Sequence, residues 1–371
     1  MKKKIGLILT GGGARASYQV GALKGIQEIA KKHNLPLNIS IIVGSSAGSI
    51  NATYLASHMD QPNWNIDELA TLWNTLKTEK IYDVAFWALV GKALRGVFEL
   101  SSGDFVEKKQ MKALLDNAPL KQFLSKSIPF DRIQKNIDAQ HLDALAIKTI
   151  NYSTGTANTF FQGNPSLEGW NRSGRLGLPD NIHIGHIMAS TALPVLFPPE
   201  KIGDYEFGDG SMRNHTPLSS AIKLGADKLL IIGVKQKQPK QVVKETSLSR
   251  MMGLVLNTLL LDAIDLDYER LIQVNKMVKM LTDSNLESPY RQVDPYILRP
   301  SDDIGEIAME YQSEIPKTVR HFIQGLGRKQ ESSDLCSYLL FEAPFTTKLY
   351  ELGYKDALED EENIKTFLVE D

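Results

Sequence analysis

The sequence predicts an α/β fold, a three-layer α/β/α sandwich with a mostly parallel central sheet and a helical cap insertion. Apolar strands at residues 5–9 and 39–43 are each followed by a glycine-containing turn and then by a helical pattern. Because the connecting loops are short, these two strands are expected to be parallel neighbours. Residues 229–234 form a third apolar run of the same kind.

The composition is typical of a globular protein with a sizeable core. Of the 371 residues, 42% are hydrophobic, and 42 Lys and Arg residues nearly balance 44 Asp and Glu residues. This balance provides no long-range attraction to nucleic acid, so we expect no nucleic-acid partner. The single cysteine, Cys336, excludes an intramolecular disulfide and a cysteine-based zinc cluster and suits a reducing compartment. We expect neither a cofactor nor a metal ion.

The N-terminus resembles the start of a signal peptide only superficially. Three lysines at residues 2–4 precede an apolar run at residues 5–9, which is shorter than the ~7–15 residues of a signal-peptide core. No other stretch reaches the ~18 apolar residues of a membrane-spanning helix. We therefore expect a cytoplasmic protein that contacts a membrane, if at all, only at its surface.

The first half of the chain alternates strands and helices and then changes character. One helical pattern covers residues 16–33, and a second covers residues 47–55. Each follows a strand and a glycine turn, so both turns should lie at the carboxyl ends of strands, where α/β sheets bind ligands. From about residue 60 to 141 the alternation stops, and tryptophans and phenylalanines are scattered over helical patterns. We interpret this region as an inserted cap.

One segment of the cap, residues 86–98, carries only two charges, both of them basic. It is suited to a membrane interface or to a lid over an acyl chain, and equally to a cap helix packed on the core. The residues expected to contact lipid are Phe86, Trp87, Leu89, Val90, Leu94, Val97 and Phe98.

The second half returns to the α/β pattern. Strands are expected at residues 142–152, 158–162, 206–207 and 229–234, and helices at 184–190 and 218–224. A loop at 235–250, a long amphipathic helix or helix pair at 251–281, and an acidic tail or surface helix at 356–371 follow. We divide the chain into a catalytic domain, residues 1–235, and a helical extension, residues 236–371, that packs on or completes it.

The sharpest motif is Gly44-Ser45-Ser46-Ala47-Gly48, which has the form G-x-S-x-G. In a nucleophile elbow, a strained strand-to-helix turn presents the serine hydroxyl, and the glycines on either side avoid clashes of Cβ atoms. Ser46 is therefore a candidate nucleophile, supported by Gly44 and Gly48. The alternative is a serine N-cap in an ordinary βα turn.

The glycine-rich segment that begins at Gly11, Gly12 and Gly13 and includes Arg15 and Ala16 fits the loose dinucleotide pattern G-x-G-x-x-A. That interpretation lacks the acidic residue expected at the end of the second strand. A second interpretation is an oxyanion hole, in which backbone N–H groups at a helix start face a developing negative charge. Arg15 would add positive potential or hold the loop. A third interpretation of the segment is an ordinary glycine-rich turn between a strand and a helix.

A nucleophilic serine needs a base. None of the seven histidines lies in an obvious catalytic turn, and the best placed, His215, is also explained as a polar loop residue. Asp209 lies between Gly208 and Gly210 after a strand, which lets its carboxylate face another loop. An aspartate in an ordinary β-turn explains the same residues.

Taken together, the three motifs resemble the patatin-like phospholipase family, whose pattern is a GGGxRG loop, a G-x-S-x-G elbow and a DG[GA] turn in that order. Residues 189–198 and 214–226 also resemble the family's segments on either side of the aspartate turn, so the resemblance covers about residues 5–235. It implies a sandwich of the patatin type and a serine lipid acyl hydrolase, acting chiefly on glycerophospholipids without a metal. It also implies a dyad in which Asp209 takes the proton of Ser46, and an oxyanion hole at the glycine loop.

Two residues depart from the family pattern. Ala16 stands where the pattern has glycine, and Ser211 stands where it has glycine or alanine. Neither change removes a reacting atom, but Ala16 is close enough in sequence to the glycine loop, and Ser211 to Asp209, to affect turnover. Two alternatives therefore stay open, a non-enzymatic regulator that binds an acyl lipid or a nucleotide, and a Ser-His-Asp carboxylesterase that uses His215 or His321.

Overall fold

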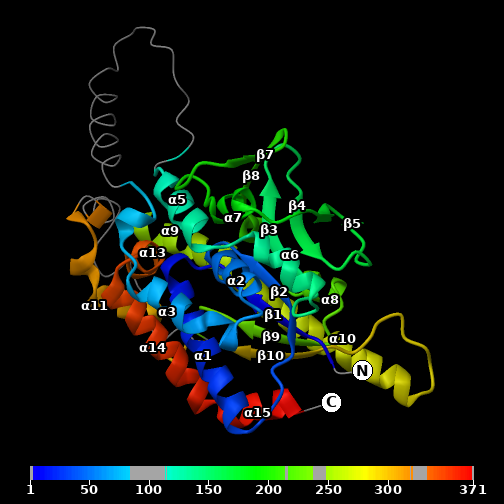
Figure 1. Cartoon of the computed structure of the whole chain (residues 1–371). Helices are drawn as coiled ribbons and strands as arrows, with labels where there is room; N and C mark the ends of the chain where they lie inside the picture. The colour runs from blue at the N-terminus through cyan, green and yellow to red at the C-terminus, as the bar shows by residue number, and fades with distance from the viewer. Residues whose placement is uncertain are drawn as a thin grey trace.

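A computed structural model gives the fold of the chain (Figure 1). The structure describes residues 3–83, 113, 115–213, 216–236, 248–317, 319–320 and 332–369. The cap segment 86–98, expected to contact lipid, lies outside these residues, as do His215 and His321.

The described strands form one sheet. They are β1 (Ile5–Leu9), β2 (Ile39–Ser45), β3 (Ala144–Asn151), β4 (Ala157–Gly163), β5 (Trp170–Arg172), β6 (Arg175–Pro179), β7 (Glu200–Ile202), β8 (Tyr205–Asp209), β9 (Lys228–Ile232) and β10 (Asp294–Leu298).

Most of the described helices surround this sheet. The N-terminal half and the cap contribute α1 (Ser17–Lys32), α2 (Ala47–Ser57), α3 (Ile66–Asn74), α5 (Ala118–Ser127) and α6 (Asp131–Asp138). The rest of the chain contributes α7 (Ile184–Thr191), α8 (Ser219–Lys223), α9 (Leu248–Asn257), α10 (Ala263–Asp283), α11 (Ile304–Glu310), α13 (Ser333–Leu339), α14 (Ala343–Glu359) and α15 (Glu361–Val369).

The sheet has the order β10-β9-β1-β2-β3-β4-β6-β5, with β8 paired to β3 and β7. The five strands from β10 to β3 are parallel, which confirms that β1 and β2 are parallel neighbours. Strand direction changes at β3, because β4 and β8 both run antiparallel to it. The predicted α/β class with a mostly parallel sheet is confirmed.

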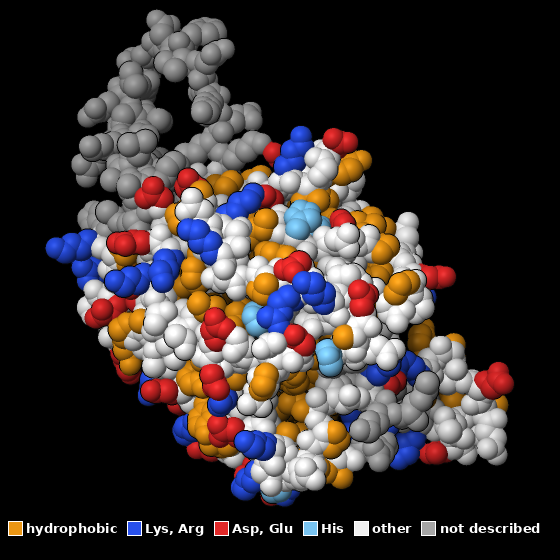
Figure 2. Space-filling model, viewed as in Figure 1, with side chains coloured by type: hydrophobic (Ala, Val, Ile, Leu, Met, Phe, Trp, Pro, Cys, Tyr) orange, Lys and Arg blue, Asp and Glu red, His pale blue; other side chains and the backbone are white. Residues whose placement is uncertain are grey.

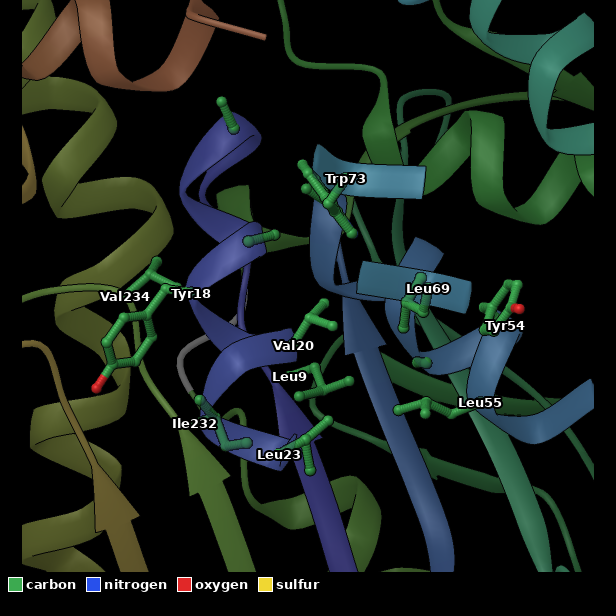
Figure 3. Packing of buried hydrophobic residues seen from close by; sticks show 14 of the residues in the cluster. Leu9, Tyr18, Val20, Leu23, Tyr54, Leu55, Leu69, Trp73, Ile232 and Val234 are labelled. Atoms are coloured by element: carbon green, nitrogen blue, oxygen red, sulfur yellow. The ribbon is translucent and has the colours of Figure 1, made fainter. Parts of the chain in front are cut away.

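The two faces of the sheet bury different side chains, as the alternation along a strand requires. Leu7 and Leu9 of β1 pack with α1 and α2 in the larger core, while Ile8 packs with α8 and α10 in the smaller one. Figure 3 shows side chains from β1, β9, α2 and α3 gathered around α1. These two cores separate the three layers.

Helix α1 is enclosed on its outer side as well, by α14 (Figure 1). The two helices lie so close that a Cβ atom at Gly21 would be 1.9 Å from the backbone oxygen of Tyr350. The Tyr18 hydroxyl donates to the Asp356 carboxylate across this contact, at 3.0 Å. The acidic C-terminus forms the surface helix α15, which buries Ile364, Phe367 and Leu368.

Several elements differ from the expectations. The run predicted at residues 251–281 is helical throughout, with α9 and α10 joined by a π-helical turn, Thr258–Asp262. Short strands β5, β6 and β7 were not anticipated, nor was β10 in the region expected to be helical. Pro295 within β10 is tolerated because β10 lies at the edge of the sheet.

The surface agrees with the near-neutral net charge of −2. Basic and acidic side chains are interspersed on the face seen in Figure 2. Among the described helices, none combines the length and the apolar composition needed to cross a membrane.

Candidate active site

Ser46 lies between the end of β2 and the start of α2, as an elbow requires. Its backbone has φ 50° and ψ −133°, a conformation that non-glycine residues rarely adopt. Close approaches explain the two flanking glycines. A Cβ atom at Gly44 would lie 2.5 Å from Cα of Ser49, and one at Gly48 would lie 2.4 Å from the backbone oxygen of Leu9. The turn is therefore strained and tightly packed.

Sheet topology brings Asp209 to Ser46. One edge of β3 pairs with β4 from Ala144 to Ile150, so β2 and β8 share the other edge. They meet end to end there, because Lys148 pairs with Ser45 of β2 and the next residue, Thr149, pairs with Asp209 of β8. Two strands that run in opposite directions thus end at the same point.

The Asp209 carboxylate is fully buried, with 0% of its surface exposed. Its Oδ1 accepts a hydrogen bond from the backbone N–H of Ser211 at 2.9 Å. The backbone N–H of Asp209 donates to the backbone oxygen of Ala192 at 3.0 Å. Oδ2 accepts no hydrogen bond in the part of the chain that the structure describes. A buried acceptor is therefore available beside the serine.

Burial raises the pKa of Asp209 from 3.8 to about 6. The hydroxyl of Ser46 lowers this pKa, as do the backbone and hydroxyl of Ser211, but burial has the larger effect. At neutral pH the carboxylate is thus ionised and more basic than an ordinary aspartate. Such a group is a better proton acceptor for an alcohol than a solvated carboxylate.

The glycine loop lies against the same serine. A Cβ atom at Gly11 would be 2.9 Å from both Cβ of Ser46 and Oγ of Ser211, so only glycine fits there. Gly13 has φ +57° and lines the same pocket as Ser46. Gly12 precedes the short 3-10 helix Gly13–Ala16, so the loop brings its backbone to a helix start beside Ser46.

An apolar pocket opens above Ser46. Its walls come from α2, α3, α5, α13 and the loop after α7. Besides Gly13 and Ser46 the lining residues are Ala47, Ile50, Tyr54, Leu69, Leu72, Trp73, Leu76, Ile81, Leu120, Phe123, Leu124, Ser127, Ile128, Thr191, Leu193, Phe197, Tyr338, Leu339 and Phe341.

Comparison with known proteins identifies the family. The family model for patatin-like phospholipase matches residues 7–222, more than half of the chain. The chain belongs to the patatin-like phospholipase family. No curated protein matches it. Among solved structures, VipD from Legionella pneumophila is similar, at 13% identity and a TM-score of 0.34, over 91% of this chain and 66% of that chain.

Membership in the patatin-like phospholipase family has a direct chemical meaning. The family is named for phospholipases, which are lipid hydrolases. The match ends at Ile222, so the described elements from β9 onward lie beyond it.

In this patatin-like phospholipase, the Arg15 side chain holds the glycine loop. Its Nε donates to Oγ of Ser337 at 2.8 Å, and its Nη2 pairs with Oδ1 of Asp334 at 3.1 Å. The guanidinium also lies over the ring of Tyr338, 4.2 Å from its centroid. Of the two roles considered for Arg15, adding positive potential or holding the loop, these contacts correspond to holding the loop.

Ser190 supports the elbow, and sequence reasoning did not assign it a role. Its Oγ accepts from the backbone N–H of Ser46 at 3.0 Å and donates to the oxygen of Lys148 at 2.7 Å. The family-like segment at residues 189–198 was the available signal. The two departures are also accommodated, since Ala16 is fully buried and Oγ of Ser211 lies 2.8 Å from Oγ of Ser45.

The histidines of this patatin-like phospholipase fall into two groups. His215 and His321 lie outside the described residues, and none of the five described histidines hydrogen-bonds to Ser46 or Asp209. His186, the most buried of these five, lies against Phe160 and His183. Among the described residues, no group of three or more His, Cys, Asp and Glu side chains is arranged to hold a metal ion.

Proposed function

We propose that this chain is a serine hydrolase of the phospholipase A or lysophospholipase type, with Ser46 as nucleophile and Asp209 as general base. The observation that carries this proposal is the meeting of Ser46, which lines the apolar pocket, with the buried carboxylate of Asp209 where β2 and β8 end. The preferred substrates are glycerophospholipids, whose acyl chain enters the pocket while the ester carbonyl reaches Ser46.

The first half-reaction forms an acyl-enzyme. Oδ2 of Asp209 accepts the proton of the Ser46 hydroxyl as Oγ attacks the ester carbonyl carbon. Backbone N–H groups of the glycine loop, residues 11–13, stabilise the oxyanion, and each such donor typically contributes ~3 kcal/mol. When the tetrahedral intermediate collapses, the carbon–oxygen bond to the glycerol breaks. The proton on Asp209 passes to the departing alcohol.

The second half-reaction reverses these roles with water. Asp209 takes a proton from a water molecule, and the resulting hydroxide attacks the acyl carbonyl. The bond to Ser46 then breaks, the proton returns to Oγ, and a free fatty acid leaves. A raised pKa of about 6 suits both half-reactions, because Asp209 must accept a proton and release it at physiological pH.

Product analysis on a lipid panel tests this proposal. We expect wild-type protein incubated with diacyl and monoacyl glycerophospholipid vesicles to release free fatty acid, measured by mass spectrometry, and Ser46→Ala to release none. Release of a phosphorylated head group would contradict acyl ester cleavage. No product from any lipid, with no labelling by a fluorophosphonate, would favour the non-enzymatic binder.

The pocket also predicts an effect on chain length. Ala47, Ile50 and Tyr54 lie on one face of α2, at spacings of three and four residues, so the pocket extends ~10 Å along the helix from Ser46. Replacing Ile50 with tryptophan should block this path about one turn from Ser46. We expect kcat/KM for long acyl esters to fall at least ~10-fold, while a short acetyl or butyryl ester is hydrolysed nearly as before.

The matched control is Ile50→Leu, which keeps the volume and should leave the chain-length profile unchanged. Equal losses on short and long esters in Ile50→Trp would mean that the acyl chain does not lie along α2.

A further inference from the structure

A segment far beyond the family match contacts the glycine loop. Residues 332–341 include α13 and lie more than 100 residues after the match ends at residue 222. A Cβ atom at Gly13 would be 2.3 Å from the backbone oxygen of Tyr338, so loop and α13 are in direct contact. The Tyr338 and Leu339 side chains also line the pocket above Ser46.

Asp334 is the charged centre of this contact. Its Oδ1 pairs with Nη2 of Arg15, and its Oδ2 pairs with Nη1 of Arg250, each at 3.1 Å. The Arg15 side chain is only 4% exposed, whereas that of Arg250 is 25% exposed. A buried guanidinium needs a paired charge, because an unpaired one is strongly unfavourable away from water. The position of Arg15 therefore depends on Asp334 more than the position of Arg250 does.

We propose that Asp334 is a positioning residue for acyl hydrolysis, which holds the glycine loop against Ser46 through Arg15. Arg15 lies two residues after Gly13, in the same 3-10 helix, so a shift of its side chain moves the loop backbone. Asp334 touches neither substrate nor the reacting atoms. The inference rests on the proposed function, since the loop matters only if it stabilises an oxyanion there.

The effect should fall on kcat rather than on KM. Oxyanion donors act in the transition state, and a displacement of about 1 Å in a catalytic group costs ~10²-fold in rate. In Asp334→Asn, which keeps the shape but removes the charge, we expect kcat for a soluble acyl ester to fall ~10- to 100-fold with KM within ~3-fold of wild type. Asp334→Glu, which restores the charge, should recover part of the loss.

The matched control is Arg250→Gln, which removes the other ion pair of the same carboxylate. We expect its kcat to stay within ~3-fold of wild type. Arg15→Gln should resemble Asp334→Asn, and the double variant should be no worse than either single variant, because the two residues act as one unit. Thermal denaturation of each variant checks that it is folded.

The possible outcomes separate this inference from the proposed function. If wild-type protein shows no hydrolysis that depends on Ser46, the proposed function fails. If the wild type is active and Asp334→Asn keeps its kcat, or raises KM alone, Asp334 does not position the loop. If Asp334→Asn does not fold, the comparison of Asp334→Glu and Arg15→Gln with Arg250→Gln decides, and equal kcat values in all three would overturn the inference.

Discussion

Ser46→Ala is expected to reduce fatty acid release to the uncatalysed background, a loss of ~10⁴-fold or more, because the variant lacks the hydroxyl proposed to form the acyl-enzyme. The serine is only 2% exposed, but it lines the pocket and alanine removes only its hydroxyl oxygen, so the free energy of unfolding should change by less than about 1 kcal/mol. Hydrolysis of a soluble ester and thermal denaturation measure the two effects.

Ser45→Ala is the matched control for this variant. It removes the neighbouring hydroxyl, which pairs with Ser211 at 2.8 Å, but leaves the elbow serine in place. We expect a fluorophosphonate probe to label wild-type protein and Ser45→Ala but not Ser46→Ala. Substantial hydrolysis by Ser46→Ala in a contaminant-free preparation would refute the assignment of the nucleophile.

Asp209→Asn is expected to lower kcat by ~10²–10⁴-fold, the usual cost of losing a general base. Asparagine keeps the size of the side chain and can still accept from the Ser211 N–H, but it cannot take the serine proton. Combined with Ser46→Ala, it should be no worse than Ser46→Ala alone. Asp204→Asn, in the exposed turn before the same strand, serves as control and should retain activity.

Histidine variants distinguish the dyad from a triad. His215→Gln and His321→Gln should cost little activity if Asp209 takes the serine proton directly. If either histidine variant is inactive and Asp209→Asn is active, the enzyme uses a Ser-His-Asp arrangement instead.

The pH dependence provides a second readout of Asp209. The folded pKa of about 6 lies above the unfolded value of 3.8, so the folded state binds the proton more tightly. The ionisation of Asp209 therefore lowers the free energy of unfolding. This loss grows as the pH rises from about 4 to 6 and is complete above about pH 6. We expect Asp209→Asn to raise the free energy of unfolding at pH 8 by on the order of 2–3 kcal/mol, and to lose this advantage near pH 4.

Denaturant titrations of the wild type and Asp209→Asn at both pH values measure this difference. Wild-type kcat/KM should also fall about tenfold per pH unit below about pH 6, as the base becomes protonated. A stability difference that does not vary with pH would show that the carboxylate is not desolvated.

Much of this site could be predicted from the sequence because its parts are local. An apolar run that ends in Gly44 and Gly48 around a serine predicts a strand, a strained turn and a helix, and the structure has β2, Ser46 with φ 50° and α2 in that order. The glycine loop after β1 and the aspartate at the end of β8 were found in the same way. Each pattern extends over only a few residues.

Only the tertiary structure decided how these parts meet. Ser46 and Asp209 come together because β2 and β8 share one edge of β3, and strand order and register have no local pattern in the sequence. Arg15 and Ser337 are 322 residues apart, yet they hold the glycine loop to α13. The same holds for β10, whose short proline-containing strand forms only because β9 offers it a partner. Contacts of this kind depend on how the whole chain packs, since each partner alone is an ordinary polar or apolar residue.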